Sequence, residues 1–82
     1  MLRPGPKIVS KPERVRVRTW RDVDIAYALV CNTHPEPRKG VVSIEGDWRS
    51  GKVVVGEGAV FADDALVLDM PPLGVAIVRL EK

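Results

Sequence analysis

The sequence predicts an all-β fold, a small antiparallel β-sandwich of about seven or eight strands, with a partly open β-barrel as the alternative. Of its 82 residues, 14 are valine, whose β-branched side chain favours strands over helices. Apolar and polar residues alternate with a period of two over short segments, and no window of about 11 residues has the helical period. Turns rich in Gly, Pro and Asp separate these segments every ~8–12 residues, as in small sandwiches and barrels.

A proline-rich arm precedes the first predicted strand. Residues 1–13 contain three prolines, which remove backbone donors and restrict the residues before them, so we expect an extended segment. The pair Ile8 and Val9 within this arm is suited to an edge strand. The first strand is expected at 14–18, where arginine and valine alternate and the two valines share a face.

The second predicted strand, 24–32, follows a short turn that we expect at Arg21-Asp22. Its alternate residues are bulky on one face and small on the other. The bulky face comprises Ile25, Tyr27, Leu29 and Cys31, and the small face comprises Ala26, Ala28 and Val30. Because both faces are apolar, we expect a central strand covered on both sides. Cys31 is then a small buried apolar residue rather than a nucleophile.

Five further strands complete a β-domain that spans residues 14–82. The predicted strands are 40–45, 52–55, 59–61, 65–70 and 75–80. Alternation points these apolar residues inward: Val42, Ile44, Leu66, Leu68, Met70, Ala76, Val78 and Leu80. The connecting loops and turns are 32–40, 46–51, 56–58, 63–64 and 71–74, all rich in Gly, Pro or Asp. His34 lies in the first of these loops, where we expect a solvated side chain.

Length and composition argue against an enzyme. The 82 residues make one small domain, and the single Cys excludes an internal disulfide. One Cys and one His do not supply a closed zinc site, and no glycine motif for phosphate is present, so we expect neither metal nor cofactor. The adjacent acids Asp63 and Asp64 are typical of a solvated turn, because glycosidase carboxyls face each other across a cleft.

The composition also bears on source and location. The chain has no Gln and one Asn, and 29% of its residues are charged, a pattern typical of hyperthermophilic proteins. No segment approaches the ~20 apolar residues of a membrane span, and the first residues lack the apolar region of a signal peptide. One Cys is compatible with a reducing compartment, so we expect a cytoplasmic protein that does not contact membranes.

Three features of the chain form a pattern: an Asn after a strand (Asn32), the turn Asp47-Trp48-Arg49-Ser50-Gly51-Lys52, and above all residues 65–80. The last of these reads Leu-x-Leu-x-Met-Pro-Pro-Leu-Gly-Val-x-Ile-x-x-Leu from Leu66 on. Over roughly residues 14–82, and most clearly over 65–80, this pattern resembles the C-terminal all-β domain that follows the catalytic barrel in glycoside hydrolases of the β-galactosidase and α-amylase groups. The family often has an aromatic residue where this chain has Leu73. The resemblance implies a non-catalytic accessory domain, since the catalytic carboxylates of such enzymes lie on the barrel.

Two tryptophans are candidates for carbohydrate binding. Trp20 continues the outward face of the first strand, and Trp48 lies in a turn, so both positions allow an exposed ring that stacks on a sugar. The favoured alternative is that each tryptophan covers an end of the small core or packs on a neighbouring subunit.

Three arginines are candidates for nucleic-acid binding. Arg14, Arg16 and Arg18 share one predicted face that Trp20 extends, and basic side chains around an aromatic ring can hold a phosphate backbone and stack a base. Residues 1–21 carry seven basic and one acidic side chain, whereas 22–82 carry six basic and ten acidic, for a net charge of only +2. This weak overall charge favours the alternative, cross-strand ion pairs with acids such as Asp22, Asp24 or Asp69.

The sequence therefore favours a non-catalytic accessory or interaction module that packs on a protein partner or self-associates. An 82-residue sandwich buries only ~60–65% of its unfolded surface, so apolar residues remain outside. The outward residues Val41, Val67, Val75 and Ile77 are the expected contact surface.

Overall fold

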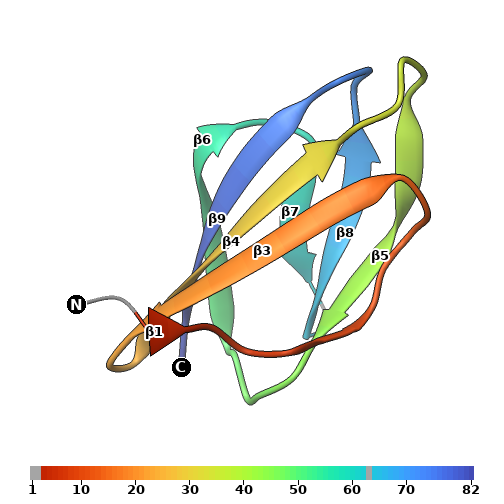
Figure 1. Cartoon of the computed structure of the whole chain (residues 1–82). Coiled ribbons are helices and arrows are strands. Elements are labelled where there is room, and N and C mark those ends of the chain that lie inside the picture. Colours follow the sequence, from red (N-terminus) through yellow and green to blue (C-terminus); the bar gives the residue numbers. More distant parts are fainter. Residues whose placement is uncertain (1–2, 63) are drawn as a thin grey trace.

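The computed structural model describes residues 3–62 and 64–82, and within them every regular element is a β-strand. The strands form two antiparallel sheets that face each other (Figure 1). They are β1 (Arg3–Pro4), β2 (Ile8–Ser10), β3 (Val15–Asp22), β4 (Ile25–Asn32), β5 (Arg38–Ile44), β6 (Ser50–Gly56), β7 (Ala59–Ala62), β8 (Ala65–Met70) and β9 (Val75–Glu81). The all-β sandwich expected from the sequence is confirmed.

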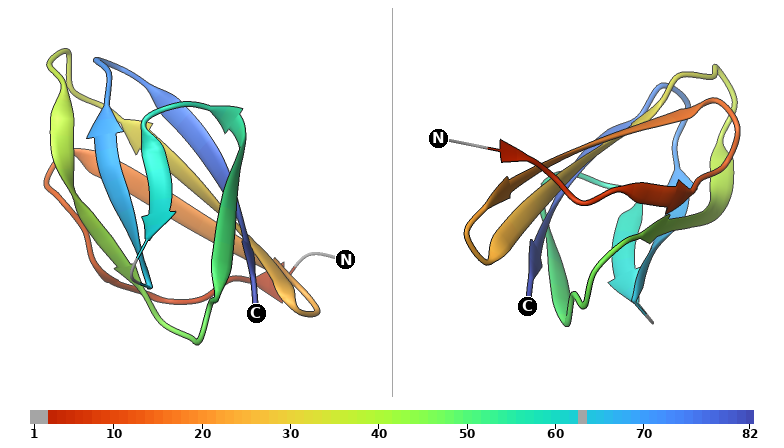
Figure 2. Two further views of the ribbon diagram at one scale, coloured as in Figure 1. Left: turned by 180° about the vertical axis from the view of Figure 1, so that it is seen from behind. Right: turned by 60° about the horizontal axis from the view of Figure 1, so that its bottom comes forward.

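The two sheets differ in size. One has five strands in the order β1-β3-β4-β9-β6, and the other has four in the order β2-β5-β8-β7. Figure 1 looks onto the five-stranded sheet, and the left view of Figure 2 looks onto the four-stranded sheet from behind. The shortest dimension of the molecule is 20 Å, which fits two sheets stacked about 10 Å apart.

The described part of the proline-rich arm joins both sheets as edge strands. β1 pairs with β3 and β2 pairs with β5, so the arm crosses from an edge of one sheet to an edge of the other (Figure 2). At the crossing, a Cβ on Gly5 would lie 2.5 Å from Thr19, and the Thr19 hydroxyl donates to the Pro6 carbonyl at 2.7 Å. The edge strand expected at Ile8 and Val9 is confirmed.

A second crossing closes the opposite edge of the sandwich. Gly56, Glu57 and Gly58 connect β6, at the edge of the five-stranded sheet, to β7, at the edge of the four-stranded sheet. Both glycines have φ in the left-handed region, +76° and +94°, and a Cβ on Gly56 would clash with the Val75 carbonyl. The interruption expected at 56–58 is therefore a change of sheet.

The five-stranded sheet contributes mainly small residues to the core, apart from the fully buried Leu80, and the four-stranded sheet contributes mainly large ones. The first set contains Ala26, Ala28, Val30, Ala76 and Val78, all fully buried. The second contains Val42, Ile44, Leu66, Leu68 and Met70, which are at most 7% exposed. Since large and small side chains interdigitate, the space between the sheets is filled. The inward residues expected on β5, β8 and β9 are confirmed.

The hairpin between β3 and β4 differs from the expectation. β3 continues through Asp22, and the register pairs Asp22 with Ile25, so the turn consists of Val23 and Asp24. Val23 is 82% exposed and has φ of 56°, a strained value for a β-branched residue. The turn expected at Arg21-Asp22 is wrong because regular pairing with β4 extends to the last residue of β3. Of the turn expected at 63–64, Asp63 lies outside the described residues.

β4 is the central strand of the five-stranded sheet, but only one of its faces is covered. Its small residues point into the core, whereas Tyr27 and Leu29 are only half-buried on the outer side. The expectation that β4 is covered on both sides is wrong. The four-stranded sheet covers the inner face, and no described segment covers the other.

Asn32, at the end of β4, is the buried polar residue of the core. Its amide nitrogen donates to the carbonyls of Glu36 at 2.9 Å and Pro71 at 3.0 Å, and its side-chain oxygen accepts from the His34 amide at 3.0 Å. One side chain thus joins the β4–β5 loop to the β8–β9 corner. The His34 imidazole also has a local role, because its Nδ1 accepts from the Glu36 amide at 3.2 Å.

Candidate interaction face

The strand register divides the outer side of the five-stranded sheet into four rows, three that cross β3, β4, β9 and β6 and a fourth that crosses β3, β4 and β9. Residues directly opposite one another on neighbouring strands share a face, so the pairing assigns each row. The rows are Asp22, Ile25, Glu81 and Ser50; Trp20, Tyr27, Arg79 and Lys52; Arg18, Leu29, Ile77 and Val55; and Arg16, Cys31 and Val75. We call these 15 residues, together with Val54, the five-strand outer face.

The centre of this face is apolar. Trp20, Tyr27, Val54 and Ile77 line a shallow hollow of about 370 Å³ without a charged side chain. Val54 is the extra residue of a β-bulge in β6, so Val54 and Val55 both lie near Ile77, and they are 47% and 54% exposed. A contiguous apolar centre on an otherwise polar surface is typical of a binding surface.

Charged groups surround the apolar centre. Arg16 and Arg18 lie on β3 at one end, beside Leu29 and Cys31. Among the described residues neither arginine makes an ion pair, so the cross-strand pairs expected for them are not formed there. The exposed Asp22 lies at the opposite end of β3. The face therefore has a basic end and an acidic end.

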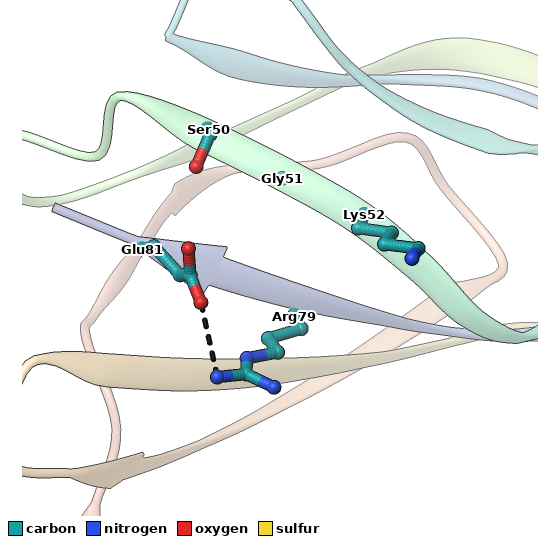
Figure 3. Close-up of a pocket in the computed structure, with 5 residues that line it drawn as sticks. All are labelled: Ser50, Gly51, Lys52, Arg79 and Glu81. Atoms are coloured by element: carbon teal, nitrogen blue, oxygen red, sulfur yellow. Dashed lines mark ion pairs between the residues drawn. The ribbon is translucent and has the colours of Figure 1, made fainter.

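A polar depression lies where β6 and β9 pair. Ser50, Gly51 and Lys52 line it from β6, and Arg79 and Glu81 line it from β9 (Figure 3). The Arg79 guanidinium is turned toward the Glu81 carboxylate, 3.0 Å away, while the Lys52 side chain extends away from Glu81 (Figure 3). Both members of the ion pair are over 40% exposed, so solvent weakens it, and its main consequence is to offset one cation of the face.

The two tryptophans have different positions. Trp20 lies on the five-strand outer face, next to Tyr27, as the alternation of β3 predicts. Trp48 is only 3% exposed, so it covers an end of the core, as the favoured alternative predicts, and the hypothesis of an exposed Trp48 for sugar binding is wrong. Its indole nitrogen donates to the Glu45 carbonyl at 3.1 Å, and the Lys82 ammonium lies 5.4 Å from its ring. Trp48 closes one end of the core, and its ring is too buried for a sugar to stack on it.

The three candidate arginines are not equivalent. Arg16 and Arg18 share the five-strand outer face with Trp20. Arg14 precedes β3 and has φ of 61°, so the alternation of β3 does not extend to it. Its carbonyl accepts from the Thr33 amide at 3.0 Å and the Thr33 hydroxyl at 2.6 Å, which joins the start of β3 to the end of β4.

The outward apolar residues expected as one contact surface lie on two opposite faces. Val75 and Ile77 belong to the five-strand outer face. Val41 and Val67 pair with each other on the outer side of the four-stranded sheet, where Val60 completes a row of three. These three valines are 45–62% exposed. Because this second face has one apolar row and no aromatic residue, it is the smaller apolar surface.

The remaining candidate residues have no geometry for chemistry. Cys31 is half-buried on the outer side of β4, so the expectation that it is buried is wrong. His34 is partly covered and bonded to its own loop rather than fully solvated. Within residues 3–62 and 64–82, no three His, Cys, Asp or Glu side chains converge as metal ligands. The same residues contain no helix of the length and apolarity that crossing a membrane requires.

Sequence reasoning missed the extent of this face. Tyr27, Leu29 and Val54 are central to it, yet Tyr27 and Leu29 were expected under cover and Val54 in an ordinary short strand. The available signal was that β4 is apolar on both faces while its neighbours β3 and β9 carry arginines on one face each.

Comparison with known proteins adds no assignment. No family model matches the chain, and neither a curated protein nor a solved structure matches it. The likeness of residues 14–82 to the C-terminal domains of glycoside hydrolases therefore remains a prediction from the sequence.

Proposed function

We propose that this protein is a non-catalytic interaction module that binds through the five-strand outer face, by packing on a protein partner or on itself. The observation that carries the proposal is the uncovered outer side of β4. A central strand normally keeps its bulky apolar residues under cover, but here Tyr27 and Leu29 are half-buried and adjoin the hollow lined by Trp20 and Ile77. Burying such an apolar surface in a complex removes it from water, which favours association.

Carbohydrate is the weaker candidate ligand for this face. Trp20 and Tyr27 lie side by side and offer aromatic surface, which sugars use. A sugar site also needs polar groups directed at the hydroxyls, and the hollow beside Trp20 is lined only by aromatic and aliphatic side chains. Trp48, the other aromatic candidate, is in the core.

Nucleic acid is also less well matched. Arg16 and Arg18 flank the apolar centre, and Trp20 could stack a base. However, Asp22 and Glu81 lie on the same face, and Glu81 pairs with Arg79. A surface with both signs of charge suits another protein better than a uniformly negative polymer.

The resemblance to glycoside hydrolases suggests the context in which the module acts. In that setting the domain is an accessory to a larger catalytic unit, and its role is to pack rather than to react. The five-strand outer face is the surface we assign to that packing, because its apolar centre is built by one side chain from each of four strands, β3, β4, β9 and β6.

A pair of variants tests the proposal. Leu29→Glu introduces a charge on the five-strand outer face, whereas the control Val67→Glu introduces the same charge on the opposite face. We expect Leu29→Glu to weaken complexes of the protein by about 2 kcal/mol or more, and Val67→Glu to leave them unchanged. The readouts are mass by light scattering over a concentration series and capture of partners from an extract of the source organism.

The proposal fails in either of two cases. One is a wild-type protein that stays monomeric and captures nothing. The other is an equal loss in both variants while both remain folded by circular dichroism, because the outer side of β4 would then have no special role.

A further inference from the structure

We infer that the occupant of the five-strand outer face is a second copy of this chain, packed face to face with antiparallel strands. The inference rests on the proposed function and specifies the partner. A two-fold axis in the plane of the interface and parallel to the rows lays each strand over the same strand of the second copy. It also lays the first row over the fourth, and the second row over the third.

This arrangement brings opposite charges together at both ends of β3. Asp22 and Arg16 occupy the first and fourth rows on β3, so each lies opposite the other residue of the second copy. The contact forms twice because of the symmetry. Both side chains are exposed in the single chain, and among the described residues neither makes an ion pair, so both are available.

The central rows are also complementary to each other. Arg18 lies opposite Trp20 of the second copy, which pairs a cation with an aromatic side chain. Leu29 lies over Tyr27 of the second copy, so the half-buried side chains of β4 cover one another. On β3 and β4 the second and third rows thus bring aromatic and aliphatic side chains together, while on β9 and β6 Arg79 and Lys52 lie over Ile77 and Val55 of the second copy.

The other two-fold arrangement of the same faces is electrostatically poorer. An axis parallel to the strands lays the first row over the first and the fourth row over the fourth. Asp22 and Glu81 of both copies then gather at one end, and Arg16 of both copies at the other. Like charges brought together oppose association, so the charge distribution selects the axis parallel to the rows.

The face has an adequate size for a dimer. Four strands about 4.8 Å apart and four rows about 6.8 Å apart give roughly 500 Å² in projection. Because side chains make the surface uneven, its accessible area is larger than its projection and approaches the ~800 Å² per partner of a standard interface. The expected product is a reversible dimer whose population depends on concentration.

Charge reversal tests the arrangement. Arg16→Asp places two acids opposite each other, and Asp22→Arg places two arginines opposite each other, so each single variant should dimerise about tenfold more weakly. The double variant Arg16→Asp/Asp22→Arg restores opposite charges and should dimerise like the wild type. Analytical ultracentrifugation from micromolar to about millimolar concentration measures the four dissociation constants, those of the wild type, the two single variants and the double variant.

A matched control uses the other sheet. Lys39 and Asp69 are paired across β5 and β8, away from the five-strand outer face. Lys39→Asp and Asp69→Lys change the same charges and should leave dimerisation unaltered. Since every substituted residue lies on the surface, circular dichroism is expected to show folded protein throughout, and recovery in the double variant is an independent sign of folding.

Three results would overturn the inference. If the wild-type chain is monomeric at about millimolar concentration, a second copy is excluded as the occupant of the five-strand outer face. If Leu29→Glu nevertheless abolishes capture of another protein, the proposed function survives and that protein is the occupant. A dimer that neither single reversal weakens, or that the double variant does not recover, excludes this arrangement of the two faces.

Discussion

The two faces of β4 differ in burial although both are apolar. The inner face carries Ala26, Ala28 and Val30, which are fully buried, and ends at the buried Asn32. The outer face carries the larger side chains of Tyr27 and Leu29, which are only half-buried. Hydrophobicity alone would have reversed the two, since the bulkier set has more surface to remove from water.

The neighbouring strands explain this choice. Tyr27 is paired with Arg79 on β9 and with Trp20 on β3, and Leu29 is paired with Arg18. Directly opposite residues share a face, so turning β4 over would either bury two arginines or break the register. An unpaired buried charge costs far more than an exposed leucine does. The face of β4 with the bulkier apolar side chains therefore points outward because the arginines beside it on β3 and β9 must stay in water.

Of the variants that compare the two faces of β4, Asn32→Ala at the end of the inner face is expected to lose the most stability. It removes the buried amide that donates to two carbonyls and accepts from the His34 amide, leaving polar groups of two loops without partners. We expect a loss of about 3 kcal/mol in the free energy of unfolding, measured by denaturant titration. Thr33→Ala, next in sequence, removes an exposed hydrogen bond to Arg14 and should cost under about 1 kcal/mol. Similar losses in both would show that the amide does not connect the loops.

A leucine placed on either face of β4 compares the two directly. Ala28→Leu adds volume to the filled core and should destabilise the chain by about 2 kcal/mol. Cys31→Leu adds the same side chain to the outer face and should change stability by under about 0.5 kcal/mol. Chemical denaturation suits this test, since the amide-poor composition predicts high thermal stability. Equal losses in the two variants would mean that the outer side of β4 is tightly covered.

The smallest expected change in stability concerns the hairpin turn between β3 and β4. Val23 is exposed with φ of 56°, so Val23→Gly relieves backbone strain and should stabilise the chain by about 0.5–1 kcal/mol. Val60 is similarly exposed but lies inside β7, where Val60→Gly should cost about 1 kcal/mol. Chemical denaturation of the two variants, at one protein concentration, measures the two changes in the free energy of unfolding. A loss of stability in Val23→Gly would show that this turn is not strained.

Strand positions were largely predictable because alternation is a local property. The strand expected at 65–70 has the observed bounds, and that at 75–80 differs by one residue. Turn positions were less predictable, since pairing extends β3 through Asp22 although Arg21-Asp22 has the composition of a turn. The position of Trp48 was not predictable either. It is set by a loop that bends at Gly46, with φ of +118°, and returns the indole to the Glu45 carbonyl.

The sequence by itself determined that the chain forms short strands separated by Gly, Pro and Asp turns, and that β5, β8 and β9 each have one apolar and one more polar face. Those features depend on residues two or three positions apart. Only the tertiary structure decided which face of β4 is buried, because both are apolar and the choice depends on the charges of β3 and β9 across the ladder. The same pairing brings Trp20, Tyr27 and Ile77, from three separate segments, into one exposed surface.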